Sequence, residues 1–326
     1  MGAKRLHGLD GLRGLAALLV ALFHMDYIYS TPGFFQRCYI LVDLFFMLSG
    51  FVLARTFEAR MAEGLTPRSF VVMRFRRLWA PVSIGSLIGI GLWFLKGVPL
   101  STCLTYLVIA TLLLPDLIIE FGTFPYNQPA WSITFELVAN LVHVAILSRL
   151  RVPVLLAIAF ASALTLLSSP FAGSMDVGSS SRFLYGFPRV LMSYSLGIVL
   201  WRTLGDKSRC SPWPAFVGAP VIFIGYSTLI EPDLFWFDLP VAIGASALLI
   251  ISGLGVRENG RLAHACAAGG ALSFPLYAVH YPVFLFVQAT GGAKWIALAI
   301  AVALAAVIAL TLEKASWPAG TAAATT

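Results

Sequence analysis

Arg13 and His24 stand eleven residues apart in the apolar stretch LDGLRGLAALLVALFHM, residues 9–25. Eleven residues advance an α-helix by about three full turns, so the two side chains share one face and lie about 16 Å apart along the axis. A charged side chain in a membrane helix is costly and usually faces a cavity in which it has a function. The spacing therefore predicts a polar path with a cation at one end and an imidazole, the usual general base near neutral pH, at the other.

A second group of basic residues lies in FVVMRFRRLW, residues 70–79, which places Arg74, Arg76 and Arg77 within four positions. Such a cluster before a membrane segment is often only a topology signal. Each guanidinium group can also form bidentate hydrogen bonds to two oxygens, which suits the binding of a polyphosphate. The sequence has neither a Walker loop nor a GxGxxG dinucleotide fingerprint, so a phosphate-bearing ligand would be held by side chains.

The composition is that of a membrane protein. Of 326 residues, 59% are hydrophobic and only 11% charged, and the mean hydropathy is +0.87, whereas soluble domains carry about a quarter charged residues. We expect an all-α, polytopic helical bundle with one integral membrane domain over residues 1–317 and a disordered tail over 318–326. The net charge of +7 fits cytoplasmic loops better than nucleic-acid binding. The four scattered cysteines predict neither a metal site nor a disulfide framework.

Eleven apolar segments are long enough to form helices. They cover residues 11–28, 38–57, 79–95, 104–119, 131–148, 152–168, 187–202, 214–230, 235–254, 272–289 and 293–312.

The distribution of positive charge predicts the topology, because Lys and Arg are enriched in cytoplasmic loops. Lys96 outside and Arg149 inside require an odd number of crossings between them, so segments 104–119 and 131–148 cannot both span. We interpret 104–119 as re-entrant or as lying partly along the membrane, which gives ten crossings with both termini in the cytoplasm. This arrangement leaves five of the 22 lysines and arginines outside, namely Arg37, Lys96, Arg182, Arg189 and Lys294.

With this topology, several polar side chains converge on one layer in the outer half of the membrane. Asp43 and Glu136 each lie five residues into a helix that starts outside, Arg189 lies near the outer surface, and His280 lies closer to the middle. Each has a structural alternative: a membrane histidine often joins helices by a hydrogen bond, and Asp43 could simply neutralise Arg189. The convergence with His24 favours a functional site.

These residues fall in motifs that resemble the membrane-bound acyltransferase 3 family, which O-acylates sugars and related hydroxyl compounds. The resemblance implies about ten membrane helices and an acyl-CoA donor taken from the cytoplasm. The matching stretches occur in the family's order and are LDGLRGLAALLVALFH with its Arg-x10-His spacing, VDLFFMLSGFVLAR, RFRRLWAP, PAWSITFELVANLVH, RVLMSYSLG and LSFPLYAVHYPV.

The resemblance and the spacing together imply a mechanism. His24 would be the general base, and Asp43 or Glu136 would fix its tautomer; an acyl-His24 intermediate is the alternative. Acyl-CoA, expected to be acetyl-CoA, is a co-substrate, and no permanently bound cofactor is expected. The remaining predicted contacts are Arg13, Arg74, Arg76 and Arg77 with the coenzyme A phosphates, and Trp131, Arg189 and His280 with the acceptor or the oxyanion.

The residues and the resemblance together predict a multi-pass inner-membrane O-acetyltransferase that modifies a hydroxyl of an extracytoplasmic or lipid-linked sugar or glycan. Two other classes stay open. A proton-coupled transporter would use the same buried charges and need no thioester, and a non-catalytic scaffold would tolerate a conservative change of His24.

Overall fold

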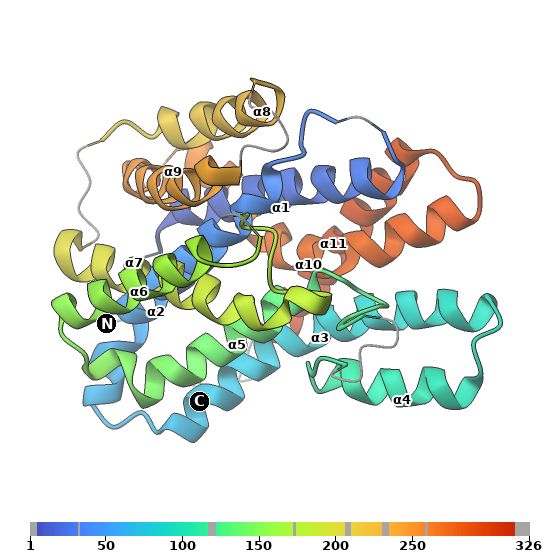
Figure 1. The fold of residues 1–326 in the computed structure, drawn as a ribbon, viewed down its shortest axis with the longest axis horizontal. Coiled ribbons are helices and arrows are strands. Elements are labelled where there is room, and N and C mark those ends of the chain that lie inside the picture. The colour runs from blue at the N-terminus through green and yellow to red at the C-terminus, as the bar shows by residue number, and fades with distance from the viewer. Residues whose placement is uncertain are drawn as a thin grey trace, which may run out of the picture.

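The computed structural model describes residues 5–31, 33–116, 122–171, 174–205, 210–229, 235–257 and 260–316. Throughout these ranges the regular structure is helical, without a β-strand (Figure 1). The predicted all-α class is therefore confirmed. The predicted tail over residues 318–326 lies outside the described residues.

Each of the eleven predicted segments overlaps one α-helix of the structure. The helices are α1 His7–Ile28, α2 Leu41–Ala62, α3 Pro67–Leu95, α4 Leu100–Thr111, α5 Ala130–Ala145, α6 Val152–Leu167, α7 Gly186–Leu204, α8 Ala219–Leu229, α9 Asp238–Gly253, α10 Arg261–Ala289 and α11 Lys294–Ser316.

Helix α3 begins twelve positions before the predicted segment 79–95, at Pro67. Thr66 caps its N-terminus by accepting a hydrogen bond from the Ser69 backbone N–H at 3.2 Å, and Pro67 suits the first helical position. The hydropathy pattern places the start of this segment after the arginines, because charged residues lower the local hydropathy. The helix itself already includes them. The three arginines therefore lie within α3, and the prediction that they precede the helix was wrong.

Six helices of the described chain are long and apolar enough to cross a membrane, and five apolar helices of 10–17 residues are shorter. The six spans are His7–Ile28, Cys38–Ala62, Pro67–Leu95, Ser180–Leu204, Arg261–Ala289 and Lys294–Leu312. The chain is thus a multi-pass membrane protein, while ten crossings and the orientation of the termini stay predictions.

Helix α4 has 12 residues, about 18 Å at 1.5 Å per residue, which is well short of a bilayer core of about 30 Å. It forms a hairpin with α3 at one end of the molecule (Figure 1). After the helix the chain turns at Leu113, whose φ is 57°, and Asp116 accepts a hydrogen bond from the Tyr106 hydroxyl at 2.6 Å. The re-entrant path stays a prediction, and residues 117–119 of that segment lie outside the described residues.

Glycines bring two pairs of helices into close contact. A Cβ at Gly14 of α1 would lie 2.7 Å from the backbone of Gly269 in α10, and a Cβ at Gly50 of α2 would lie 2.1 Å from the Tyr194 carbonyl oxygen in α7. A larger residue would force each pair apart. The close approach of α1 to α10 and of α2 to α7 positions the polar side chains described below.

A proline in α10 shapes the same region. Pro282 has no N–H to donate to the carbonyl of Ala278, four residues earlier. That carbonyl accepts instead from the Asn127 side-chain amide at 2.8 Å, which joins α10 to the segment before α5.

Candidate active site

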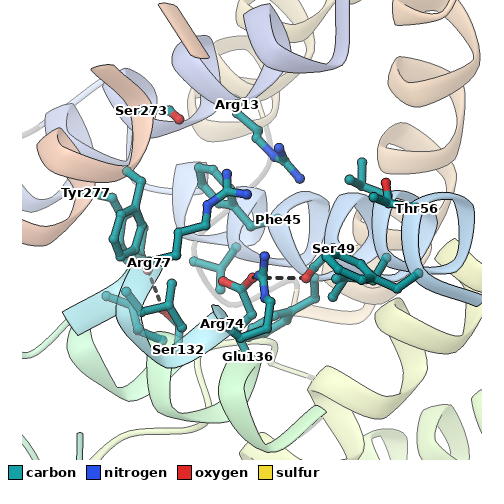
Figure 2. A pocket seen from close by; sticks show the side chains of 18 residues that line it. Arg13, Phe45, Ser49, Thr56, Arg74, Arg77, Ser132, Glu136, Ser273 and Tyr277 are labelled. Atoms are coloured by element: carbon teal, nitrogen blue, oxygen red, sulfur yellow. Dashed lines mark hydrogen bonds and ion pairs between the residues drawn. The ribbon is translucent and has the colours of Figure 1, made fainter. Parts of the chain in front are cut away.

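A cavity of about 220 Å³ lies between α1, α2, α3, α5 and α10. Its charged lining consists of the guanidinium groups of Arg13, Arg74 and Arg77 and the carboxylate of Glu136. Figure 2 shows the guanidinium groups of Arg13 and Arg77 directed into this space from two different helices. We call it the arginine cavity; three cations against one anion favour an anionic ligand.

One arginine of this cavity is fixed by protein contacts. Arg74 donates to Glu136 at 2.8 Å, and Ser49 of α2 donates to the same carboxylate oxygen at 3.0 Å (Figure 2). Arg13 lies 3.9 Å from Asp10, three residues earlier on α1. Within the described chain Arg77 forms no ion pair or hydrogen bond through its side chain, and it is exposed, so its donors are accessible to a ligand.

Arg76 does not belong to the predicted group. It is exposed and is not among the residues that line the cavity. Consecutive residues on a helix point about 100° apart, so Arg77 and Arg76 cannot both face the same narrow space. The prediction that all three arginines of α3 form one phosphate site is therefore corrected to Arg74 and Arg77, with Arg13 from α1.

A second cavity, of about 100 Å³, lies farther along α1 and contains His24. We call it the histidine cavity. The predicted acceptor residues Trp131 and Arg189 also line it, together with Gln128, Tyr39 and Asp176 among others. Trp131 is only 9% exposed, and the Arg189 guanidinium lies 5.3 Å from the centre of its ring, so little of the indole surface faces the cavity.

The two cavities adjoin. Val42 of α2 and Tyr277 of α10 line both of them, and we call these two residues the shared wall. The Tyr277 hydroxyl forms a 2.7 Å hydrogen bond with the Ser132 hydroxyl (Figure 2). Arg13 and His24 thus lie on one helix in neighbouring cavities, as their spacing predicts.

His24 does not contact either predicted carboxylate. Its Nδ1 lies 3.0 Å from the Val20 carbonyl oxygen and 3.0 Å from Nε2 of His280, while the Tyr281 ring packs perpendicular to the imidazole. Glu136 lines the arginine cavity. The expectation that Asp43 or Glu136 orients His24 was wrong, because both carboxylates pair with arginines.

Asp43 and Arg189 form a buried ion pair between α2 and α7. Their side chains are 0% and 1% exposed, and two guanidinium nitrogens donate to one carboxylate oxygen at 2.8 and 3.0 Å. Arg189 also donates to the carbonyls of Val177 and Tyr39, each at 3.1 Å, and Ser193 donates to the other Asp43 oxygen. Four of the five N–H donors of Arg189 are therefore used in holding the wall of the histidine cavity together.

His280 was predicted to bind the acceptor, but it is 0% exposed and does not line the histidine cavity. Its Nδ1 lies 3.0 Å from the Leu276 carbonyl oxygen. It contacts His24 from within the protein, so a direct contact with the acceptor is not supported by the geometry.

Sequence reasoning missed three polar residues of the site: Ser49, Ser132 and Tyr277. All three occur within the motif stretches VDLFFMLSGFVLAR, PAWSITFELVANLVH and LSFPLYAVHYPV. Tyr277 precedes His280 by three positions, which places both on one side of α10, and this spacing was the available signal. Ser49 and Ser132 are small neutral residues in apolar helices and give no such signal.

The helical membrane fold has an arginine-lined cavity suited to an anionic ligand, and a histidine suited to general base catalysis lies in the adjoining cavity. These features are typical of a group-transfer enzyme. The sequence matches the acyltransferase domain of the acyltransferase 3 family over residues 6–313. The protein belongs to this family and is a membrane acyltransferase.

Two similar proteins cover parts of the chain. Protein 2 in the picA locus of Rhizobium radiobacter is 33% identical over an alignment of 153 positions, and the match covers 41% of this chain and 78% of that protein. The peptidoglycan O-acetyltransferase OatA of Listeria monocytogenes is 34% identical over 77 residues, which are 23% of this chain and 12% of that protein. No solved structure matches the chain significantly.

Proposed function

We propose that the protein transfers an acetyl group from cytoplasmic acetyl-CoA to a hydroxyl of an extracytoplasmic or lipid-linked sugar, with His24 as the general base. The observation that carries the proposal is the adjacency of the two cavities, one with Arg13, Arg74 and Arg77 and the other with His24. A sugar acceptor is also in line with the name of the O-acetyltransferase OatA, to which part of the chain is similar.

The arginine cavity suits the phosphates of coenzyme A. Guanidinium groups bind phosphate oxygens in pairs, and the three arginines come from α1 and α3. Arg55, Arg60 and Arg68 flank the same end of α2 and α3, which the positive-inside rule assigns to the cytoplasm. The donor would therefore enter from the cytoplasm without crossing the membrane.

The thin pantetheine arm would extend along α1 from Arg13 toward His24. Their separation of about 16 Å along the axis suits an extended chain of this kind. The arm has to pass Val42 and Tyr277, and the thioester would then lie beside the histidine cavity. The acceptor hydroxyl would enter that cavity from the opposite side, near Gln128 and Trp131.

His24 would take the proton of the acceptor hydroxyl as its oxygen attacks the thioester carbonyl carbon. The tetrahedral intermediate then expels the coenzyme A sulfur, which receives the same proton from His24. The products are an O-acetyl ester and free coenzyme A. Tyr277, at the shared wall, donates its hydroxyl proton to Ser132, whose own proton goes to the Pro129 carbonyl oxygen. It would serve the oxyanion only by exchanging that bond during the reaction.

The test measures transfer of label from radiolabelled acetyl-CoA to glycans in membrane preparations. His24→Ala is compared with His264→Ala at matched protein levels. His264 is an exposed histidine of α10, so its loss should not affect transfer. Loss of a general base is expected to reduce incorporation by about 100-fold or more.

Equal incorporation by wild type and His24→Ala would exclude His24 as the base. No incorporation by the wild type would exclude acetyl transfer to these acceptors. The transporter alternative would then be supported if the same membranes take up a solute in response to a proton gradient and without acetyl-CoA.

A further inference from the structure

The contact between His24 and His280 determines which ring nitrogen of His24 carries a proton. We infer that His280 is a positioning residue that fixes His24 in the Nδ1–H tautomer and leaves its Nε2 free to act as the base. This inference rests on the proposed function for its catalytic meaning, while the tautomer itself can be measured independently of activity.

The argument starts at His280, which is fully buried. Its Nδ1 lies 3.0 Å from the Leu276 carbonyl oxygen, and a carbonyl oxygen only accepts hydrogen bonds. Nδ1 of His280 therefore carries the proton. A neutral imidazole has a single N–H, so Nε2 of His280 bears a lone pair and is an acceptor.

The same reasoning then applies to His24. Its Nδ1 lies 3.0 Å from two atoms, the Val20 carbonyl oxygen and Nε2 of His280. Both are acceptors, so Nδ1 of His24 has to be the donor. In the neutral ring the proton is then absent from Nε2, and no hydrogen bond engages that nitrogen among the residues the structure describes.

The surroundings hold the ring in this orientation. Tyr281 packs perpendicular to His24 with ring centres 5.3 Å apart, and its hydroxyl donates to Gln128 at 2.9 Å. His24 is half-buried and lines the histidine cavity. Since Nδ1 is engaged by protein atoms, Nε2 is the nitrogen available to a hydroxyl in that cavity.

His280 would also act during the reaction. When Nε2 of His24 takes the proton of the acceptor hydroxyl, the ring becomes an imidazolium that keeps its Nδ1–H. The lone pair of His280 Nε2 and the Val20 carbonyl oxygen then accept from this N–H and stabilise the charge. In many acyl-transfer enzymes a carboxylate does this. Here the two predicted carboxylates, Asp43 and Glu136, are paired with arginines, and Asp176, which also lines the histidine cavity, lies 3.8 Å from Arg182.

The first measurement is made on the wild-type protein, in lipid nanodiscs, with ¹⁵N-labelled histidine. Nitrogen NMR at mildly alkaline pH distinguishes protonated from unprotonated ring nitrogens, and the His24 signals are assigned by their absence in His24→Ala. We expect a protonated Nδ1 and an unprotonated Nε2. A protonated Nε2 would overturn the inference whether or not acetyl transfer is observed.

The second measurement compares His280→Leu, His280→Gln and the control His264→Gln. His264 lies on the same helix with the same kind of Nδ1 contact, to the Gly260 carbonyl at 2.9 Å, but it is exposed. His280→Leu removes the acceptor and should lower kcat about 10- to 100-fold with the KM for acetyl-CoA unchanged. The Gln side chain supplies an acceptor oxygen and should recover part of kcat.

Equal loss of kcat in both His280 variants, with a protonated Nε2 on His24 in the wild type, would show that His280 only fills space. Wild-type protein with the expected tautomer but no acetyl transfer would contradict the proposed function and leave the assignment of protons intact.

Discussion

At the scale of single residues, Arg76 and Arg77 show how a helix separates two identical side chains. They are consecutive, yet only Arg77 lines the arginine cavity, since one step along α3 rotates the side chain by about 100°. The two arginines carry the same charge on the same helix and therefore form a matched pair for testing the donor site.

Arg77→Gln is expected to raise the KM for acetyl-CoA about tenfold or more, because it removes charge-assisted hydrogen bonds worth about 1.5–3 kcal/mol. Arg76→Gln should leave this KM within about twofold of the wild type. The measurement is the initial rate of acetyl transfer at varied acetyl-CoA. Equal effects of the two variants would mean that the arginines act only through their general positive charge.

For the candidate site, the sequence predicted which residues share a helix face, but it did not predict the partner of each side chain. Arg13 and His24 lie on one helix, so their spacing fixes their relation, and the structure places them in adjoining cavities. Asp43 and Glu136 lie on different helices, and counting residues gives how deep they are without giving which way they face. That rotation is decided by helix packing, which pairs Asp43 with Arg189 and Glu136 with Arg74.

At the scale of elements, the crossing of α1 and α10 determines the contact between His24 and His280. Gly14 and Gly269 allow the two backbones to approach closely. Apolar periodicity predicts both helices, but it contains no information on which pairs of helices pack together. The sequence therefore predicted all eleven helical segments and left open the pairing of α1 with α10.

Gly14→Ala is expected to destabilise the protein by about 1–3 kcal/mol, because the added methyl group would overlap the Gly269 backbone. Gly91→Ala is the control, since Gly91 lies within α3 and a Cβ there meets no atom within 4 Å. Alanine has the higher helix propensity, so this variant should gain about 0.5–1 kcal/mol. Thermal unfolding in detergent gives the sign of each change.

A gain in stability for Gly14→Ala would contradict the close contact of α1 and α10. If Gly14→Ala folds, its acetyl transfer should also fall, because separation of the two helices lengthens the bond between the two histidines. Gly91→Ala should keep the wild-type rate, as it lies outside both cavities.

At the scale of the whole molecule, the arginine cavity and the histidine cavity adjoin at the shared wall, and in the proposed function this wall separates the donor from the acceptor. Five helices contribute to the arginine cavity, and they come from both ends of the chain. No continuous stretch of sequence contains the shared wall, because Val42 and Tyr277 are 235 positions apart. The sequence motifs therefore indicated the arginines and His24, but they could not predict that Val42 and Tyr277 separate the two cavities.

The shared wall is expected to limit the size of the acyl group. Val42→Ala widens it and should raise kcat/KM for butyryl-CoA relative to acetyl-CoA, whereas Val42→Phe should lower transfer from both donors. Val52→Ala is the control, because Val52 lines only the arginine cavity. The ratio of kcat/KM for the two donors is the measurement, and an unchanged ratio in Val42→Ala would exclude a role of the wall in donor selection.

The shared wall also bears on how well the membrane stays impermeable to water and protons. Two hydrated openings on opposite sides of a bilayer would, if they joined, conduct water and protons and dissipate the ion gradients that a cell maintains. Val42 and Tyr277 are 5% and 6% exposed and stand where the openings would meet. Under the proposed function, this packed wall would let an acyl chain pass while leaving no open channel for water and protons.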